Sequence, residues 1–137
     1  MRKVDDLSSL QGKQVLKFSV YHPERCEELC APYFTPSWRD KVTLAAAGKE
    51  WMDSTPPEGE KSIAVEFIRQ RLGISLEETC TFGDNLNDIA MLQNAGMSYA
   101  VANARAEVQA AARKVCPSYS EDGVLQILKR IVSESRK

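Results

Sequence analysis

The residues best suited to chemistry lie in the segment FGDNLND (residues 82–88), between a β-prone run and a helix-forming run. Asp84 and Asp88 are four residues apart, so a loop and a first helical turn can point both carboxylates into one strand-end crevice. Carboxylate oxygens suit Mg²⁺, which usually keeps water and a substrate phosphate among its ligands. Asn87 can donate its amide to a phosphate oxygen without adding charge. The segment therefore predicts a magnesium and phosphate site.

Lys61 is the second candidate, at the start of a helix that lies one helix and one strand before Asp84. A lysine there can reach the same strand end and offset the charge of a phosphate and of carboxylates. Residues 59–62 superficially resemble the end of a nucleotide-binding P-loop, but Glu60 separates the glycine from the lysine. We therefore expect a phosphate-binding lysine here and no nucleotide loop.

The elements that must position these residues change character at TPPEG (residues 55–59), the strongest cluster of helix and strand breakers. Before it, alternating residues predict a strand at 14–21, and Pro23 suits the first turn of a helix that ends near Ala31. Residues 42–47 and 50–54 predict two short strands joined as a hairpin at Gly48-Lys49.

After the breakers, predicted helices and strands alternate. Apolar residues at helical spacing begin near Lys61 and stop at Gly73, a residue typical of a helix C-terminus. Short β-prone runs are expected at 79–82, 98–102 and 114–116, with helices at 87–95, at 106–113 and around 124–131. This alternation predicts a parallel α/β layer.

Four motifs together resemble the C-terminal part of the Cof-type haloacid dehalogenase (HAD) phosphatases. They are Lys61, GDNLND (83–88), Ala102-Asn103-Ala104 and Glu121-Asp122-Gly123-Val124. The resemblance covers about Trp51 to Val132. It implies an α/β fold: a partial HAD (Rossmann-like) core with parallel strands at 59–137, preceded by a remnant of an α+β cap domain at 1–58, a strand-helix-strand-strand portion.

The same resemblance implies roles for the candidate residues. Asp84 would ligate Mg²⁺, Asp88 would help hold the metal site and Lys61, and Lys61 and Asn87 would bind the substrate phosphate. Lys61 and Asp88 would be the catalytic residues of this part of the chain. Ser62 departs from the family's usual glycine after the lysine, a mild change because serine is tolerated at a helix start.

A larger departure concerns the nucleophile. The family attacks phosphorus with the first Asp of a DxD motif, and a further motif supplies a Ser or Thr. Asp5-Asp6 is adjacent instead of DxD and follows no apolar strand. We therefore expect a chain that begins within the cap, binds Mg²⁺ weakly and is inactive by itself, because the covalent aspartyl-phosphate route is closed.

Composition narrows the function classes. The net charge of −1 gives no reason to expect nucleic acid or an anionic membrane as partner, and apolar residues at 43% are ordinary for a globular protein. The charged N-terminus is followed by no apolar signal-peptide core, and the cysteines show no CxxC pair. We therefore predict a cytoplasmic protein. Cys26 and Cys30 with His22 could suggest zinc, but a zinc site needs about four ligands.

Two functions remain open. The first is part of a Mg²⁺-dependent phosphomonoesterase for small phosphorylated metabolites such as sugar phosphates, active when complemented by an N-terminal half. The second is a non-catalytic module that keeps a weak Mg²⁺ or phosphate pocket and acts through assembly. An exposed sheet edge invites pairing with another chain, so a homodimer or a swapped arrangement is expected.

Overall fold

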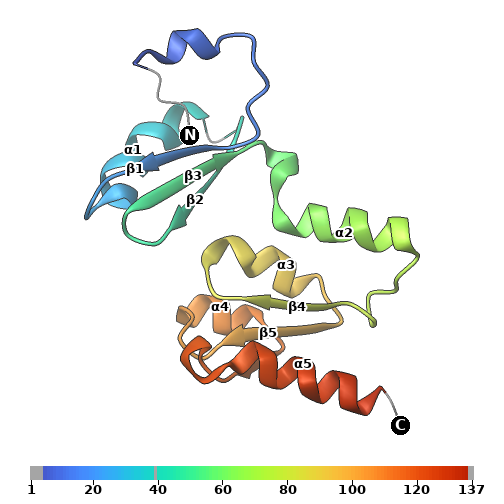
Figure 1. Cartoon of the computed structure of the whole chain (residues 1–137). Helices are drawn as coiled ribbons and strands as arrows, with labels where there is room; N and C mark the ends of the chain where they lie inside the picture. The colour runs from blue at the N-terminus through green and yellow to red at the C-terminus, as the bar shows by residue number, and fades with distance from the viewer. Residues whose placement is uncertain (1–4, 39, 136–137) are drawn as a thin grey trace.

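The computed structural model describes residues 5–38 and 40–135. Its strands form two three-stranded sheets, the first antiparallel with strand order β1-β3-β2 and the second parallel with order β4-β5-β6. In Figure 1 the first sheet lies above the second, and α2 (Lys61–Leu72) descends between them. The α/β fold with a parallel sheet is thus confirmed.

The first sheet packs one face against a helix. Its elements are β1 (Phe18–Tyr21), α1 (Cys26–Trp38), β2 (Thr43–Ala47) and β3 (Trp51–Thr55). Met52, Ala46 and Cys26 are buried hydrophobic residues of this layer. The predicted hairpin is present between β2 and β3, and Gly48 supports its turn with a positive φ of 84°. Alternation along the strands places Ser19 and Asp53 on the opposite face, together with the aromatic pair Tyr21 and Trp51.

β1 is shorter than the predicted strand at 14–21. Pairing begins at Phe18, which lies opposite Ser54 of β3. β3 itself ends at Thr55, because Pro56 follows and has no amide to donate to a ladder. Residues 14–17 consequently have no partner strand within the described sheet.

α1 is longer than predicted and continues past Ala31 to Trp38. It contains Pro32 and Pro36, which sequence analysis would treat as helix breakers. Both prolines are exposed and lie four residues apart, hence on one side of the helix. The carbonyls that lose an amide donor there can bond to water, so the helix tolerates them.

The second sheet alternates strands with helices. Its elements are β4 (Cys80–Gly83), α3 (Ile89–Gln93), β5 (Met97–Val101), α4 (Ala106–Ala111), β6 (Lys114–Cys116) and α5 (Gly123–Glu134). A 3-10 turn at Leu86–Asp88 precedes α3, where a single helix from 87 to 95 was expected. The three β-prone runs are confirmed within one residue, and the C-terminal helix is confirmed and continues to Glu134.

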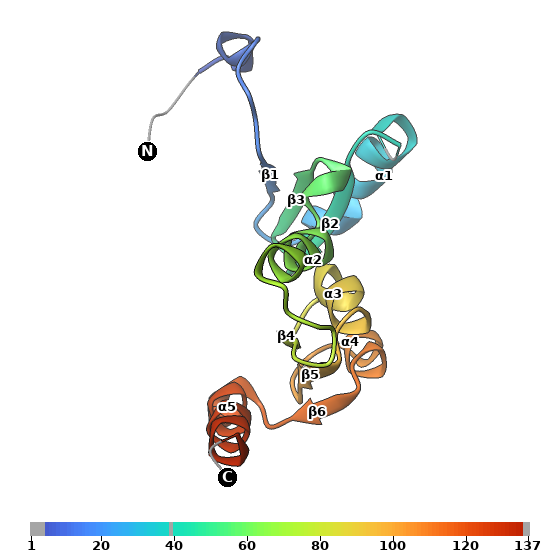
Figure 2. The same ribbon diagram turned by 90° about the vertical axis from the view of Figure 1, so that its right-hand side faces the viewer.

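Helices cover both faces of the parallel sheet. Figure 2 shows α3 and α4 on one side of the strands and α5 on the other. β5 supplies both cores, because successive side chains of a strand point to opposite faces. One buried cluster contains Tyr99, Val101, Cys116 and Ile127, and the other contains Leu92, Ala100 and Val108.

α2 connects the two sheets. A 3-10 turn at Pro57–Gly59 precedes it, and Gly73 ends it in the left-handed conformation with a φ of 66°, as predicted. Among the helices of residues 5–38 and 40–135, none has the length and apolar character needed to cross a membrane.

Candidate functional site

Lys61 and Asp88 meet at the carboxyl end of β4. They are 27 residues apart in sequence, and Lys61 Nζ donates to Asp88 Oδ1 at 2.5 Å. The Asp88 side chain is 3% exposed, whereas that of Lys61 is 52% exposed. The lysine therefore keeps one side open to solvent while its partner carboxylate is buried.

Asp88 also closes the turn that carries the site. Its Oδ2 accepts the backbone N–H groups of Asp84 at 3.0 Å and of Asn85 at 3.1 Å. Burial raises the pKa of this carboxyl, but the hydrogen bonds from Lys61 and the two amides outweigh burial, so its pKa lies below the usual value. Asp88 is consequently a carboxylate whose two oxygens are both engaged by the protein.

Gly83 makes this close packing possible. A Cβ at this position would lie 2.6 Å from Asp88 Cβ, closer than side chains approach one another. Any larger residue would displace the carboxylate from Lys61 and from the two amides. The glycine of the GD pair thus has a steric reason.

Asp84 contrasts with Asp88, because it is exposed directly after β4. Within residues 5–38 and 40–135 its carboxylate accepts no hydrogen bond from the protein, and no group of three or more His, Cys, Asp or Glu side chains is placed to hold a metal ion. Asp84 is therefore the carboxylate available to a cation, and further ligands would have to be water or substrate, as Mg²⁺ accepts.

Asn87 has a buried oxygen without a partner. Its Oδ1 is the one buried side-chain N or O atom that lacks a hydrogen bond in the described part of the chain. An unsatisfied buried acceptor costs free energy, so a donor from water or from a bound ligand is expected beside it. A water molecule held by a cation would satisfy it, which fits a hydrated metal next to Asp84.

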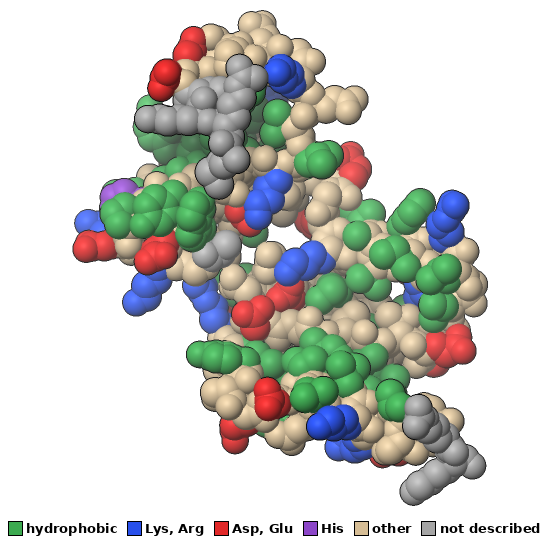
Figure 3. Space-filling view, viewed as in Figure 1, with side chains coloured by type: hydrophobic (Ala, Val, Ile, Leu, Met, Phe, Trp, Pro, Cys, Tyr) green, Lys and Arg blue, Asp and Glu red, His purple; other side chains and the backbone are tan. Residues whose placement is uncertain are grey.

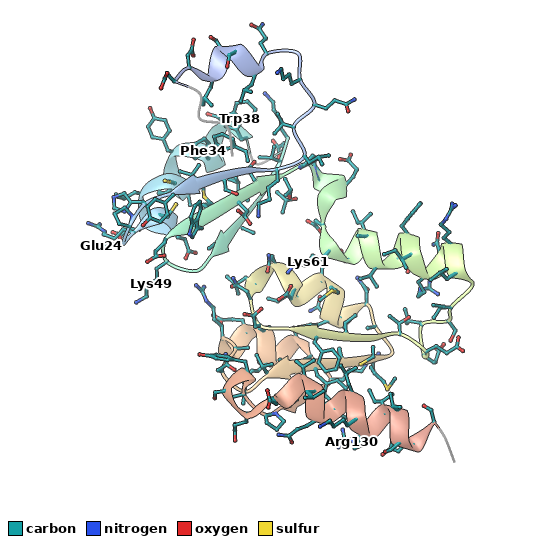
Figure 4. All side chains as sticks on the ribbon, in the orientation of Figure 1. Glu24, Phe34, Trp38, Lys49, Lys61 and Arg130 are labelled. Atoms are coloured by element: carbon teal, nitrogen blue, oxygen red, sulfur yellow. The ribbon has the colours of Figure 1, made fainter. Side chains whose placement is uncertain are left out.

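A cleft of about 480 Å³ lies between Lys61 and Asn87 and the first sheet, a volume within the roughly 300–1,000 Å³ range of small-molecule sites. Figure 3 shows acidic and basic side chains gathered around the hollow between the upper sheet and the lower one, and Figure 4 places Lys61 there at the start of α2. The lining side chains include Lys17 directly before β1, Thr43 of β2, Asp53 of β3, Lys61 of α2 and Asn87 in the turn before α3.

Three contacts join the first sheet and α1 to the rest of the chain. The Asn85 amide donates to the Ala46 carbonyl of β2 at 3.1 Å, and the Thr43 hydroxyl donates to the Glu60 carboxylate at 3.2 Å. An exposed ion pair joins Arg105 to Glu27 of α1 at 3.9 Å. The loop that carries Asp84 and Asn87 is thereby linked directly to the antiparallel sheet.

Comparison with known proteins assigns the family. The family model described as haloacid dehalogenase-like hydrolase matches residues 1–128. The chain belongs to the haloacid dehalogenase-like hydrolase family. The Cof-type resemblance of the motifs is thereby confirmed. Phosphatases of this HAD family generally depend on Mg²⁺, consistent with a carboxylate at the end of β4.

The individual HAD relatives are longer than this chain. A protein of known structure from Eubacterium rectale is 53% identical with a TM-score of 0.76, covering 96% of this chain and 49% of that one. The HAD subclass IIB sugar phosphatase BT4131 is 29% identical with a TM-score of 0.78, covering 90% and 46%. Phosphatase YwpJ of Bacillus subtilis (strain 168) is 30% identical over 118 residues, 86% of this chain and 40% of that protein. The chain thus spans half or less of these relatives' length.

The other two HAD-like motifs, at residues 102–104 and 121–124, stabilise the loops that follow β5 and β6. The side-chain oxygen Oδ1 of Asn103 accepts from Ser118 Oγ at 3.0 Å and from the Tyr119 amide at 3.1 Å, which joins the loops after β5 and β6. Gly123 starts α5 against Pro117, whose carbonyl oxygen would lie 1.8 Å from any Cβ. These residues join the loops at the carboxyl ends of the parallel strands, the end at which Lys61 and Asp88 meet.

His22 and the cysteine pair remain separate from the cleft. His22 Nδ1 accepts from the Arg25 amide at 3.1 Å, so this histidine caps the start of α1. Cys26 is buried and directs its thiol to the Val20 carbonyl at 3.2 Å, and burial raises its pKa. A buried thiol of raised pKa is a packing residue.

Sequence analysis missed the wall of the cleft that the first sheet supplies. Asp53 of β3 accepts from Lys17 Nζ at 2.5 Å and from Ser19 Oγ at 2.6 Å. Polar residues at alternating positions 17, 19 and 53 were the available signal, but only the register that places Ser19 opposite Asp53 brings them together.

Proposed function

We propose that this chain supplies the lysine, the metal carboxylate and the phosphate-binding amide of a Mg²⁺-dependent phosphomonoesterase that acts on small phosphorylated metabolites. Lys61 and Asn87 bind the phosphoryl group, Asp84 ligates the metal, and Asp88 holds Lys61 and the site turn in place. The sugar phosphatase and YwpJ relatives support a phosphorylated substrate.

The observation that carries this proposal is the pairing of a half-exposed Lys61 with a buried Asp88 beside the unpartnered Asn87 oxygen. A structural ion pair alone would not need Asn87, a residue that lines the cleft, to keep a buried side-chain oxygen without a donor. A phosphate accepts from the lysine ammonium and from the Asn87 amide, and water ordered by the ligand can donate to the free oxygen. The Lys61 ammonium, the Asn87 amide nitrogen and the Asn87 oxygen would thus each have a hydrogen-bond partner once a phosphate is bound.

Mg²⁺ would be held by Asp84 together with water and the substrate, and it would supply charge neutralisation at the phosphate. Asp88 already accepts from Lys61 and from two amides, so we assign it an indirect role at the metal. Its low pKa keeps it charged near neutral pH, which keeps Lys61 in position.

The nucleophile of the family reaction is an Asp of a DxD motif, and the 137 residues contain no Asp-x-Asp sequence. We therefore propose that this chain alone binds phosphate without turnover, and that an N-terminal half carrying DxD completes the reaction. The completed site would form the aspartyl-phosphate on that half, with Lys61 and Asn87 holding the phosphoryl oxygens.

The first test measures binding and turnover together. Calorimetry with Mg²⁺ and inorganic phosphate should show binding to the wild-type chain and at least about tenfold weaker binding to Lys61→Met, because one charge-assisted contact is lost. Asp84→Asn should weaken Mg²⁺ binding. Phosphate release from an aryl phosphate should be absent in all three proteins.

Two results would contradict the proposal. Absence of phosphate binding to the wild-type chain in the presence of Mg²⁺ would remove the phosphate site. Turnover that Asp84→Asn abolishes would mean that this chain contains its own nucleophile. Restored turnover on mixing with a DxD-containing half would support the assignment of the missing step.

A further inference from the structure

The wall of the cleft opposite Lys61 carries its own polar group. Asp53 lies at the centre of the first sheet, on β3 between β1 and β2, and its side chain is 17% exposed. Lys17 and Ser19 each donate one hydrogen bond to it. Lys17, Asp53 and Thr43 all line the cleft that Lys61 and Asn87 enter from the other side.

This group retains unused hydrogen-bonding capacity. A carboxylate offers about four acceptor positions, and an ammonium carries about three donors. Asp53 accepts two bonds, and Lys17 donates one of its hydrogens to it. The pair can therefore accept from and donate to a ligand at neighbouring points, which is what a hydroxyl group requires because it does both.

The Asp53 carboxyl group stays ionised near neutral pH, because its pKa is lowered. Burial raises the pKa of Asp53, but the hydrogen bonds from Lys17 and Ser19 and the positive charges of Lys17 and Lys61 outweigh burial and lower it. Lys61 is thus close enough for its charge to act on Asp53. A ligand whose phosphate lies on Lys61 would extend its remaining atoms toward the ionised Asp53 carboxylate and its Lys17 partner.

We propose that Asp53, held by Lys17, is the specificity-determining residue of the cleft: it binds hydroxyl groups of a polyol or sugar monophosphate and rejects substrates that carry a second anionic group. This inference rests on the proposed phosphate site and adds which part of the ligand is selected. Rejection follows from like charges facing each other in a partly desolvated cleft, an arrangement that proteins use against wrong ligands.

The alternative is an ion pair that only stabilises the sheet. Lys17 is half-exposed, and such pairs contribute little to stability. A purely structural pair would leave the relative affinities of different phosphate esters unchanged when Asp53 is altered. Ligand preference therefore separates the two roles, and a stability measurement alone would not.

The test compares four ligands by calorimetry in the presence of Mg²⁺: inorganic phosphate, butyl phosphate, sorbitol 6-phosphate and 3-phosphoglycerate. The wild-type chain should bind the sorbitol ester roughly tenfold more tightly than the butyl ester, and 3-phosphoglycerate least tightly. Asp53→Asn should reduce the first preference below about threefold and strengthen 3-phosphoglycerate binding by about tenfold or less, with inorganic phosphate unchanged. Asp40→Asn, an exposed carboxylate outside the cleft, is the matched control.

A second variant keeps the test sharp if Asp53→Asn does not fold. Lys17→Gln leaves the Asp53 carboxylate but removes its counter-charge, so 3-phosphoglycerate should bind several-fold more weakly still, opposite to the Asp53→Asn effect. Equal ligand preferences in the variants and the wild type, with phosphate binding intact, would overturn the role of Asp53 alone. Loss of phosphate binding in the wild type would overturn the proposed function and this inference with it.

Discussion

Asp88 does more at the residue scale than its position in the GDNLND motif requires. One buried carboxylate pairs with Lys61, and it also accepts the two amides that shape the turn after β4. The same residue sets where the lysine points and where Asp84 and Asn87 emerge. The geometry of the proposed site and the local stability therefore both involve this side chain, and a measurement of stability against pH can test the second role.

We expect Asp88→Asn to lower the free energy of unfolding by about 1–3 kcal/mol at pH 7, because the new amide would direct a donor at Lys61 or at the turn amides. The half-exposed Lys61 keeps this below the cost of a fully buried pair. The folded-state pKa of Asp88 is depressed, so its stabilisation is complete above the unfolded pKa of about 3.9 and is lost as pH falls through the folded value.

Urea unfolding of both proteins from pH 7 to pH 2.5 checks this. The difference in unfolding free energy should stay constant down to about pH 5 and shrink below about pH 4. Glu77→Gln, an exposed carboxylate remote from the turn, should show no such convergence. A difference that grew on acidification would show that the charged form of Asp88 is not the stabilising one.

At the scale of elements, the turn before α3 is attached to the antiparallel sheet by Asn85. This side chain accepts the Leu86 amide at 2.8 Å and donates to the Ala46 carbonyl of β2 at 3.1 Å. One residue thus caps its own turn and holds the strand that borders the cleft. These two functions use different atoms of the amide, so they can be separated.

We expect Asn85→Asp to retain the cap and to lose the contact with β2, because a carboxylate accepts but cannot donate to a carbonyl. Amide hydrogen exchange should accelerate about fivefold in the β2–β3 hairpin, corresponding to one hydrogen bond of about 1 kcal/mol, and should stay unchanged in β5. Asn85→Ala loses both contacts and serves as the comparison. Equal exchange of the hairpin in all three proteins would mean that Ala46 is held by other contacts.

At the scale of the whole molecule, one helix has an uncovered apolar side. No residue of α2 is buried, and Phe67 and Leu72 are 63% and 65% exposed. β4 beside it pairs only with β5 among the described strands, which leaves its other edge open. Exposed apolar surface and an open strand edge both favour association with another chain.

The expected association is a prediction that light scattering can check. At micromolar concentration we expect the mass of a dimer, and Phe67→Glu should shift it to that of a single chain, because a charge on the apolar side of α2 opposes burial. Lys49→Glu introduces a glutamate at an exposed position of the β2–β3 turn, away from α2, and should leave the mass unchanged. A single-chain mass for the wild type would count against association through this side.

The sequence by itself determined most of the parallel layer and its site residues. Helical spacing from Lys61 to Gly73, three β-prone runs and the GDNLND motif lead to the elements observed, because each signal is local: an apolar period, a C-terminal glycine, a strand followed by a tight turn. Less of the first sheet was predictable. β1 depends on where β3 ends, and α1 passes two prolines because their side of the helix faces solvent.

Only the tertiary structure decided how the site is assembled. It separates two carboxylates that look equivalent in sequence, burying Asp88 against Lys61 and leaving Asp84 exposed. It also brings Asp53 and Lys17 to the cleft, because strand register places residues 36 apart in sequence side by side. Residue type and spacing specify which groups are available, whereas burial and long-range pairing set their charge state and partners, and these exist only in the folded chain.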